Sequence, residues 1–215
     1  MRLLMAGSPG SGKGTHSRRL ANDLGIPHIA TGDLLREQVA LDSPIGREAK
    51  AFMDRGDYVP DNVMVDMIKL RLSQPDAEKG FVLDGYPRTQ IQAIELDKML
   101  ADIGQQIDAV IVLEVPVDEI VERLSARRTC PTCQRAYHMR YDPPVDDERC
   151  DDDASPLERR TDDEPDTVRH RLKVYSDRTA GVIEHYDVDS IVRRVSGENA
   201  SVDEVAKRID EALGL

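Results

Sequence analysis

The sequence contains few aromatic residues, no tryptophan and no long apolar run. Aromatic residues make up 4% of the 215 residues, so a core would have to be built from aliphatic side chains. No segment approaches the roughly 20 consecutive apolar residues of a membrane-spanning helix. The N-terminus also lacks the charged and then apolar segments of a secretory signal peptide. These absences predict a cytoplasmic protein that does not bind a membrane.

Positive charge is the scarcer sign. Lys and Arg number 29 against 41 Asp and Glu, which gives a formal net charge of −12. An acidic protein repels nucleic acid, so we expect no nucleic-acid partner. The length suffices for one substantial core with an inserted subdomain, and no repeat or flexible linker divides the chain.

A glycine-rich segment, Gly-Ser-Pro-Gly-Ser-Gly-Lys-Gly-Thr, occupies residues 7–15. An apolar run over residues 3–6 precedes it, and the helical pattern of Leu20 and Leu24 follows. In this setting glycines let successive backbone N–H groups face a phosphate, and Lys13 can reach the outer phosphates. The segment therefore predicts a phosphate-binding loop; the alternative is a turn without a ligand.

Four more segments read as strands, at residues 27–30, 80–84, 109–114 and 191–192. The runs at 80–84 and 109–114 are apolar throughout, as in parallel strands covered on both faces. Since ligands of such sheets lie beyond the carboxyl ends of strands, Asp84 should stand beside the loop and hold a hydrated Mg²⁺. An Asp that merely closes a strand is the alternative.

The segments between the strands show helical patterns. Helices are expected from about Leu34, after Ser43, after an N-cap at Asp61 and after another at Thr89. A further helix begins at Val117. The last helix carries an apolar stripe over residues 202–213.

Arg123 and Arg127 are four residues apart in the pattern that begins at Val117. At that spacing they should lie on one side of a helix. Two cations there would suit a polyphosphate; a solvated helix face is the alternative.

All three cysteines lie in residues 129–161, where apolar periodicity disappears. Cys130 and Cys133 form one pair, and the distance to Cys150 falls within zinc-ribbon spacing, which places the fourth ligand at Asp153. Three thiolates and a carboxylate can bind Zn²⁺, whereas a disulfide would leave one thiol unpaired. The neighbouring carboxylates of residues 151 and 152 are alternative ligands, and three free cysteines without metal are another possibility.

Taken together, these motifs resemble those of adenylate kinases over almost the whole chain. The matching motifs are residues 7–15, 31–33 with Arg36, 84–88, Arg123 with Arg127, 160–163, 167–168 and Arg171. The cysteine segment is similar to the zinc-bearing long lid of one branch of that family.

The resemblance implies an α/β fold with a P-loop parallel sheet core and helices on both faces. The core would comprise residues 1–29, 60–126 and 165–215. A helical lobe at 30–59 would bind the nucleoside monophosphate, and a zinc-ribbon-like lid would span 127–164. The implied enzyme is a monomer with ATP, AMP and ADP as its partners. It would transfer a phosphoryl group reversibly from Mg-bound ATP to AMP.

The resemblance also implies site residues. ATP would be bound by Gly10, Ser11, Gly12, Lys13, Gly14, Thr15, Arg123, Arg127, Ala136, Tyr137 and Asn199. AMP would be bound by Thr31, Arg36, Asp57, Tyr58, Val59, Gly85, Tyr86, Pro87, Arg88, Gln92, Arg160 and Arg171. The catalytic cations would be Lys13, Arg88, Arg123, Arg160 and Arg171. The structural zinc would be bound by Cys130, Cys133, Cys150 and Asp153.

The chain departs from the family pattern at four positions. His16 stands where Gln is usual, and its protonation would alter the electrostatics of the loop near neutral pH. Tyr86 replaces a more common Phe, Asp57 replaces a frequent Lys, and Pro165 interrupts the approach to the following helix.

Three other functions compete with this interpretation. The nearest is a kinase of UMP or CMP. Thr31 and Gln92 favour adenine instead, because by resemblance the pyrimidine kinases tend to carry other residues at these positions. A P-loop switch would need a water-positioning Gln beside an Asp-x-x-Gly segment, which the sequence lacks. A zinc-ribbon interaction module would explain only the cysteine segment.

Overall fold

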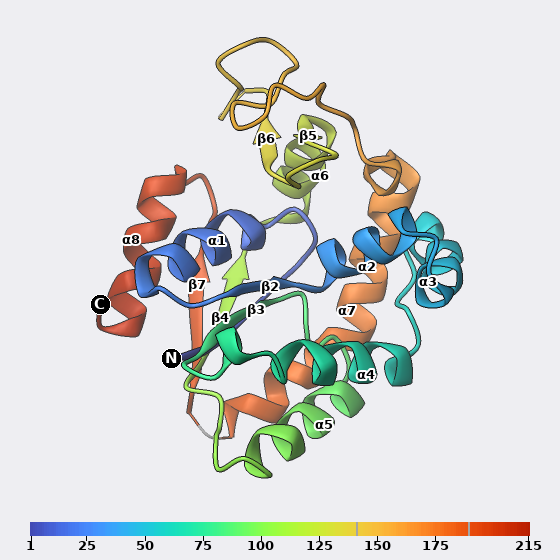
Figure 1. The fold of residues 1–215 in the computed structure, drawn as a ribbon. Coiled ribbons are helices and arrows are strands. Elements are labelled where there is room, and N and C mark those ends of the chain that lie inside the picture. The colour runs from blue at the N-terminus through green and yellow to red at the C-terminus, as the bar shows by residue number, and fades with distance from the viewer. Residues whose placement is uncertain (141, 189) are drawn as a thin grey trace.

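The centre of the molecule is a parallel sheet of five strands. The computed structural model describes residues 1–140, 142–188 and 190–215. The strands are β1 (Arg2–Gly7), β2 (His28–Ala30), β3 (Phe81–Asp84), β4 (Ala109–Glu114) and β7 (Val192–Ser196). Their order is β2-β3-β1-β4-β7, and every neighbouring pair is parallel. The predicted parallel sheet is confirmed, and β1 with its glycine-rich loop lies at its centre (Figure 1).

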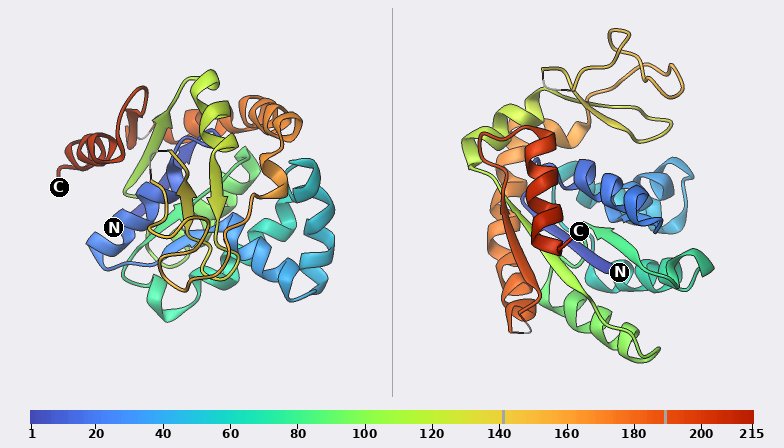
Figure 2. Two further views of the ribbon diagram at one scale, coloured as in Figure 1. Left: turned by 90° about the horizontal axis from the view of Figure 1, so that it is seen from above. Right: turned by 90° about the vertical axis from the view of Figure 1, so that its left-hand side faces the viewer.

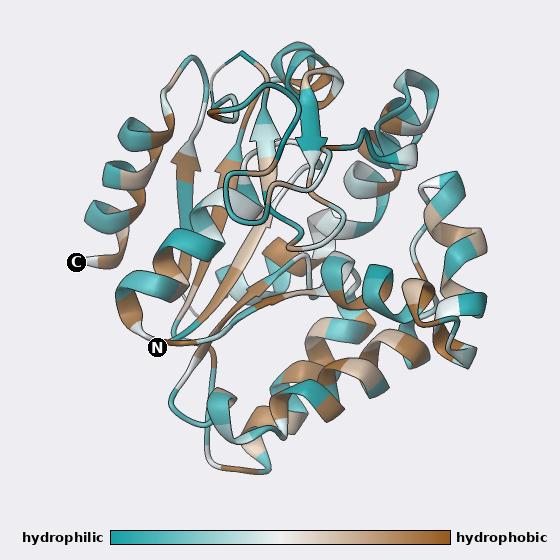
Figure 3. Ribbon diagram, turned by 45° about the horizontal axis from the view of Figure 1, so that its top comes forward, coloured by the Kyte–Doolittle hydropathy of each residue, from teal (hydrophilic) through white to brown (hydrophobic). Residues whose placement is uncertain are grey.

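Helices cover both faces of the sheet, because successive strand side chains point to opposite sides. On one face Leu3 and Met5 pack against α1 (Lys13–Leu24) and α8 (Val202–Leu213). On the other face Leu4 belongs to the core formed with α4 (Asp61–Leu72), α5 (Gln90–Ala101) and α7 (Pro165–Asp187). Apolar residues colour the sheet and the inner helix faces brown in Figure 3.

Two helices, α2 (Thr31–Ala40) and α3 (Pro44–Arg55), form a lobe beside the sheet (Figure 1). As predicted, α3 begins after Ser43, whose side chain accepts a hydrogen bond from the backbone N–H of Gly46. Helix α2 begins at Thr31, three residues before the predicted Leu34, so Arg36 lies in its second turn. A short 3₁₀ helix, η1 (Pro75–Ala77), follows α4 and leads towards β3.

The segment that carries the cysteines stands at one end of the molecule. Helix α6 (Val117–Ser125) leads into an antiparallel hairpin of β5 (Arg127–Thr129) and β6 (Ala136–His138). A 3₁₀ helix, η2 (Thr161–Asp163), then leads back to α7. The right panel of Figure 2 shows this segment beyond the end of the sheet, above α1 and α2. Its hairpin and two loops agree with the predicted zinc-ribbon-like architecture.

Three local predictions were wrong. Helix α6 ends at Ser125, so Arg127 is a strand residue and does not share a helix face with Arg123. Pro165 does not interrupt α7 but occupies its first turn, where a missing N–H costs nothing. Asp61 is the first residue of α4 rather than its cap, and its carboxylate binds side chains of the next helix.

No helix in the described residues is both long enough and apolar enough to cross a membrane.

Candidate active site

The glycine-rich loop connects the central strand β1 to α1. Gly12 precedes the helix with φ +94°, and no side chain caps its N-terminus. Gly10 has φ +83°, and a Cβ there would lie 2.8 Å from Cγ of Leu124 on α6. Only glycine fits this turn, which leaves the N–H groups at the start of α1 for an anion. The geometry is that of a phosphate-binding loop.

Lys13 and Asp84 lie together at the mouth of the loop. Lys13 Nζ donates to the carbonyl of Ser8 at 2.7 Å, and burial lowers the pKa of Lys13 to about 8. Asp84 ends β3, and its Oδ2 is 3.6 Å from His28 Nε2. Burial alone would raise the pKa of Asp84, but His28 and Lys13 outweigh it, so the pKa is lowered. The carboxylate is therefore ionised beside the loop, as the sequence predicted.

A cleft of about 1380 Å³ runs from this loop between the sheet, the lobe of α2 and α3, and the hairpin segment. The Lys and Arg side chains that line it are Lys13, Arg18, Arg19, Arg36, Arg88, Arg123, Arg127, Arg135, Arg160 and Arg171. All the predicted nucleotide-binding residues line this cleft except Ser11, Thr31 and Tyr86. Those three are at most 2% exposed. The structure therefore gathers around one cavity residues that are far apart in the sequence.

Two aspartates hold the arginines that arrive from the hairpin and from α7. Arg127 forms a two-pronged ion pair with Asp163, whose side chain is fully buried. Arg171 Nη1 lies 2.7 Å from Asp162 Oδ2. Sequence reasoning quoted both aspartates as part of a motif but gave them no role. Their position two and three residues after Arg160 was the available signal.

Arg160 is a buried cation of the cleft whose hydrogen-bonding capacity is not filled by the described residues. Its Nε is buried and has no hydrogen-bond partner in the described part of the chain. Burial, with Arg127 and Arg36 nearby, lowers the pKa of Arg160 to about 9. A guanidinium in such surroundings is stabilised by an anion, and a phosphate meets its geometry well.

On the lobe side, Arg88 is oriented by its neighbours. Its guanidinium carbon lies 5.2 Å from the centre of the Tyr58 ring, and its Nε donates to the Gly85 carbonyl at 2.7 Å. Gly85 has φ +74°, and a Cβ there would lie 2.8 Å from Arg88 Nη2. The Tyr58 hydroxyl is 3.0 Å from Thr179 Oγ1 on α7, a residue that sequence reasoning missed.

Two predicted AMP ligands hold the wall of the cleft together. Gln92 is 1% exposed, accepts from the backbone N–H of Arg88 at 2.8 Å and donates to Asp61 at 2.7 Å. Thr31 is buried and donates to the carbonyl of Gly85 at 2.9 Å. Gln92 also lines the cavity, whereas the Thr31 hydroxyl is turned to the backbone.

At the other end of the cleft, Arg123 Nη2 donates to Glu119 at 2.5 Å and to the Gly197 carbonyl at 2.9 Å. The backbone N–H of Asn199 donates to the same carboxylate at 3.3 Å. This ties α6 to the loop before α8, next to Ala136 and Tyr137 of the hairpin in the cavity wall.

His16 lines this end too, but it is only 4% exposed. Burial, with Arg19 and Arg123 nearby, lowers the pKa of His16 to about 4. The imidazole is therefore neutral near pH 7, so the expected effect of its charge on the loop near that pH was wrong.

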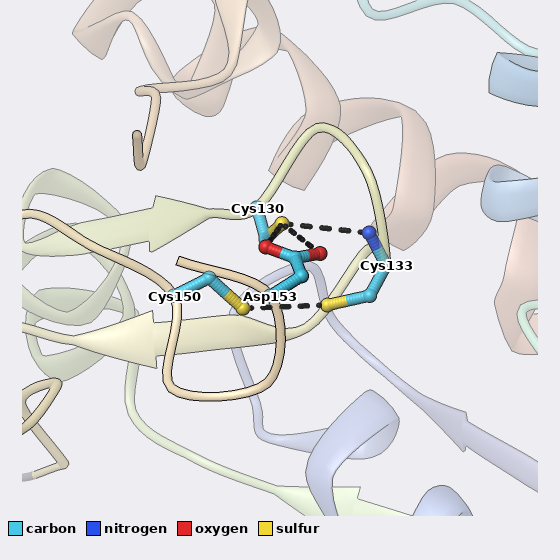
Figure 4. Close-up of side chains that lie close together, drawn as sticks. All are labelled: Cys130, Cys133, Cys150 and Asp153. Carbon is cyan, nitrogen blue, oxygen red and sulfur yellow. Dashed lines mark hydrogen bonds between the residues drawn. The ribbon is translucent and has the colours of Figure 1, made fainter. Parts of the chain in front are cut away.

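The four predicted metal ligands converge in the hairpin segment (Figure 4). Their ligand atoms all lie within 4.8 Å of one another: Cys130, Cys133, Cys150 and Asp153. The Sγ atoms of Cys133 and Cys150 are 3.5 Å apart, and Cys130 Sγ is 3.4 Å from an Asp153 oxygen. Tetrahedral ligands with bonds near 2.3 Å lie roughly 3.8 Å apart, so the cluster fits Zn²⁺.

Of the two alternative carboxylates, Asp152 lies nearer the cluster, with its Oδ2 3.8 Å from Cys133 Sγ. Asp152 accepts from Arg135 at 2.7 Å and Asp151 accepts from the backbone N–H of Val145 at 2.8 Å. Asp153 is the best placed of the three, because it has an oxygen within 4.8 Å of all three sulfur atoms.

The parallel sheet, the glycine-rich loop and the cationic cleft define the class as a P-loop phosphotransferase. A family model described as adenylate kinase matches residues 5–191. An adenylate kinase of Thermodesulfovibrio yellowstonii is 47% identical over 209 residues, 97% of each chain. One of Archaeoglobus fulgidus is 46% identical over 213 residues, 99% of this chain and 98% of the relative. The chain belongs to the adenylate kinase family, and it is a nucleoside monophosphate kinase.

Proposed function

We propose that the cleft binds ATP at the glycine-rich loop and AMP at the lobe of α2 and α3, with their phosphates meeting among the arginines. The chain transfers a phosphoryl group between ATP and AMP. Under this proposal the predicted nucleotide ligands that line the cleft keep their roles, whereas Ser11, Thr31 and Tyr86 are buried. The core, the AMP lobe at residues 30–59 and the lid at 127–164 correspond to the three walls of the cleft.

One observation supports the proposal most strongly. Ten Lys and Arg side chains from the core, the lobe and the hairpin segment line a single cavity in a protein whose net charge is −12. Arg160 in particular has its pKa lowered by burial and by the neighbouring Arg127 and Arg36. Nine Asp and Glu residues line the same cavity. The cations are stabilised further when polyphosphate occupies the cleft, and a nucleotide pair supplies phosphates from both ends.

The mechanism needs no covalent intermediate with the protein. The AMP phosphate attacks the γ-phosphorus of ATP in line, and the bond from γ-phosphorus to the β,γ-bridging oxygen breaks, which yields two ADP. Lys13 and the arginines would stabilise the charge on the transferring oxygens. The lid would exclude water, which otherwise competes as the nucleophile.

Asp84 and the hydroxyl of Thr15 are the residues that would hold the Mg²⁺ of ATP. The carboxylate suits a hard cation because it is ionised and stands next to the loop. The cation would neutralise phosphate charge when bound.

The assignment of Arg36 to AMP is tested with Arg36→Met and the control Arg47→Met. Arg47 lies on α3 of the same lobe, is exposed and pairs with Asp42, outside the cavity lining. ADP formation is measured with AMP varied at saturating ATP, and again with UMP, CMP and GMP. We expect a KM for AMP at least roughly tenfold higher in Arg36→Met and unchanged in Arg47→Met. Equal kcat/KM for AMP, UMP and CMP would reject the assignment of the lobe to adenine.

We further propose that Cys130, Cys133, Cys150 and Asp153 hold one Zn²⁺ with a structural role. The donor set would be a closed one with no open position, so no thiol is assigned to phosphoryl transfer. The metal would stiffen a segment whose own apolar cluster consists of Tyr137 and Leu157 beside the cysteines. Elemental analysis of protein purified without chelator tests this, and well under one zinc per chain after refolding with zinc would refute it.

We also propose a cytoplasmic location and a monomer, the latter as the resemblance to adenylate kinases implies. The acidic composition supports a protein without a nucleic-acid partner. Sedimentation at working concentration tests the monomer.

A further inference from the structure

Gln134, at the tip of the cysteine hairpin, has a backbone conformation that glutamine rarely adopts. It follows Cys133 directly and has φ +61°, in the left-handed region that favours Gly and Asn. A residue kept in this region is held there by its surroundings, and such positions concentrate at functional sites.

The surroundings of Gln134 span the cleft. Its side-chain Nε2 donates to the carbonyl of Pro131 at 2.9 Å, within its own hairpin. Its Oε1 accepts from Arg36 Nε of the lobe helix α2 at 3.1 Å. Its backbone carbonyl accepts from Arg18 Nη2 of α1 at 3.4 Å. One residue of the hairpin therefore contacts both the lobe and the helix behind the phosphate-binding loop.

The contact with Arg36 orients a cation without neutralising it. Arg36 already forms an ion pair with Asp33 through Nη2, and the bond to Gln134 uses a different nitrogen. An amide oxygen carries no net charge, so the guanidinium keeps its attraction for a phosphate. The internal bond to Pro131 fixes which end of the amide faces Arg36.

This contact exists only where the hairpin and the lobe meet. A cavity of about 310 Å³ lies beside it, lined by lobe residues and by hairpin residues, and both Arg36 and Gln134 belong to its wall. If the hairpin moved away from the lobe, Arg36 would lose this acceptor.

We propose that Gln134 is a positioning residue that holds Arg36 ready for the AMP phosphate when the lid lies on the lobe. Gln134 thereby links lid closure to AMP binding. The inference rests on the proposed assignment of Arg36 to AMP. It predicts an effect specific to AMP, because the contact with Arg18 on the ATP side comes from the backbone carbonyl and survives any side-chain change.

The test uses Gln134→Gly and Gln134→Asn. Both residues accept a positive φ, and neither reaches Arg36 as glutamine does. We expect the KM for AMP to rise roughly fivefold, the magnitude of one lost hydrogen bond, while the KM for ATP and kcat change less than about twofold. Metal content and the thermal unfolding midpoint should not fall, since the left-handed backbone suits the new residues. A merely structural role would instead lower the midpoint and raise both KM values.

Adding Gln134→Gly to Arg36→Met separates the two proposals. If Gln134 acts through Arg36, the double variant has the KM for AMP of Arg36→Met alone. If Arg36→Met raises the KM for AMP and Gln134→Gly does not, the positioning role is overturned and the assignment of Arg36 stands. If Arg36→Met leaves that KM unchanged, the assignment of Arg36 fails and the inference fails with it.

Discussion

Replacing His16 with glutamine should make the protein more resistant to acid. His16 is 4% exposed on α1, its Nδ1 has no hydrogen-bond partner among the described residues, and burial lowers its pKa from 6.5 to about 4. Between these pH values the unfolded chain binds a proton that the folded chain does not. The free energy of unfolding therefore rises with pH between pH 4 and pH 6.5, and the contribution of His16 is lost as pH falls through this window.

The magnitude follows from the two pKa values. At pH 5 the histidine is almost fully protonated in the unfolded chain and mostly neutral in the folded chain. The free energy of unfolding is therefore about 2 kcal/mol lower at pH 5 than at pH 7.5. Below pH 4 the cost approaches roughly 3 kcal/mol. Glutamine does not titrate, so His16→Gln should lack this loss.

Urea unfolding of both proteins at pH 7.5 and pH 5 measures the effect. The difference in the free energy of unfolding between the two proteins at pH 7.5 measures the effect of the side-chain change itself. The pH effects of carboxylates and metal ligands are common to both proteins and cancel in the comparison. We expect the wild-type protein to lose about 2 kcal/mol more than His16→Gln between the two pH values. Equal losses would refute the view that His16 is buried as a neutral group.

Three further predictions concern the loop and the metal cluster. Lys13→Met should lower kcat roughly 10²-fold or more, while circular dichroism shows intact secondary structure. Near-normal turnover would contradict the view that Lys13 stabilises the transition state. In the wild-type enzyme kcat/KM for ATP should fall above about pH 8, where free Lys13 loses its proton, and a flat profile to pH 10 would contradict the lowered pKa. Cys150→Ser should weaken metal binding and lower the thermal midpoint of the lid, whereas Asp153→Cys should retain the metal; equal metal affinity in both variants would contradict the ligand set.

Features written in contiguous residues were predictable from the sequence. The glycine-rich loop at 7–15 was recognisable because its glycines, Lys13 and flanking apolar runs are adjacent in the chain. The strands at 80–84 and 109–114 were recognisable because a buried parallel strand needs an unbroken apolar run. The metal cluster was predictable because two ligand pairs with fixed spacing form a local signal.

Interactions between distant segments could be decided only by the tertiary structure. The chain pattern extended the helix from Val117 through Arg127, but Arg127 lies in a strand and pairs with buried Asp163. Gln134 carries no local sign of its contact with Arg36, since the two are 98 positions apart. The neutral state of His16 likewise depends on packing that buries it beside Arg19 and Arg123. Burial and ion pairing depend on which segments pack against one another in the folded protein. The local periodicity of the sequence does not show which distant segments make these contacts.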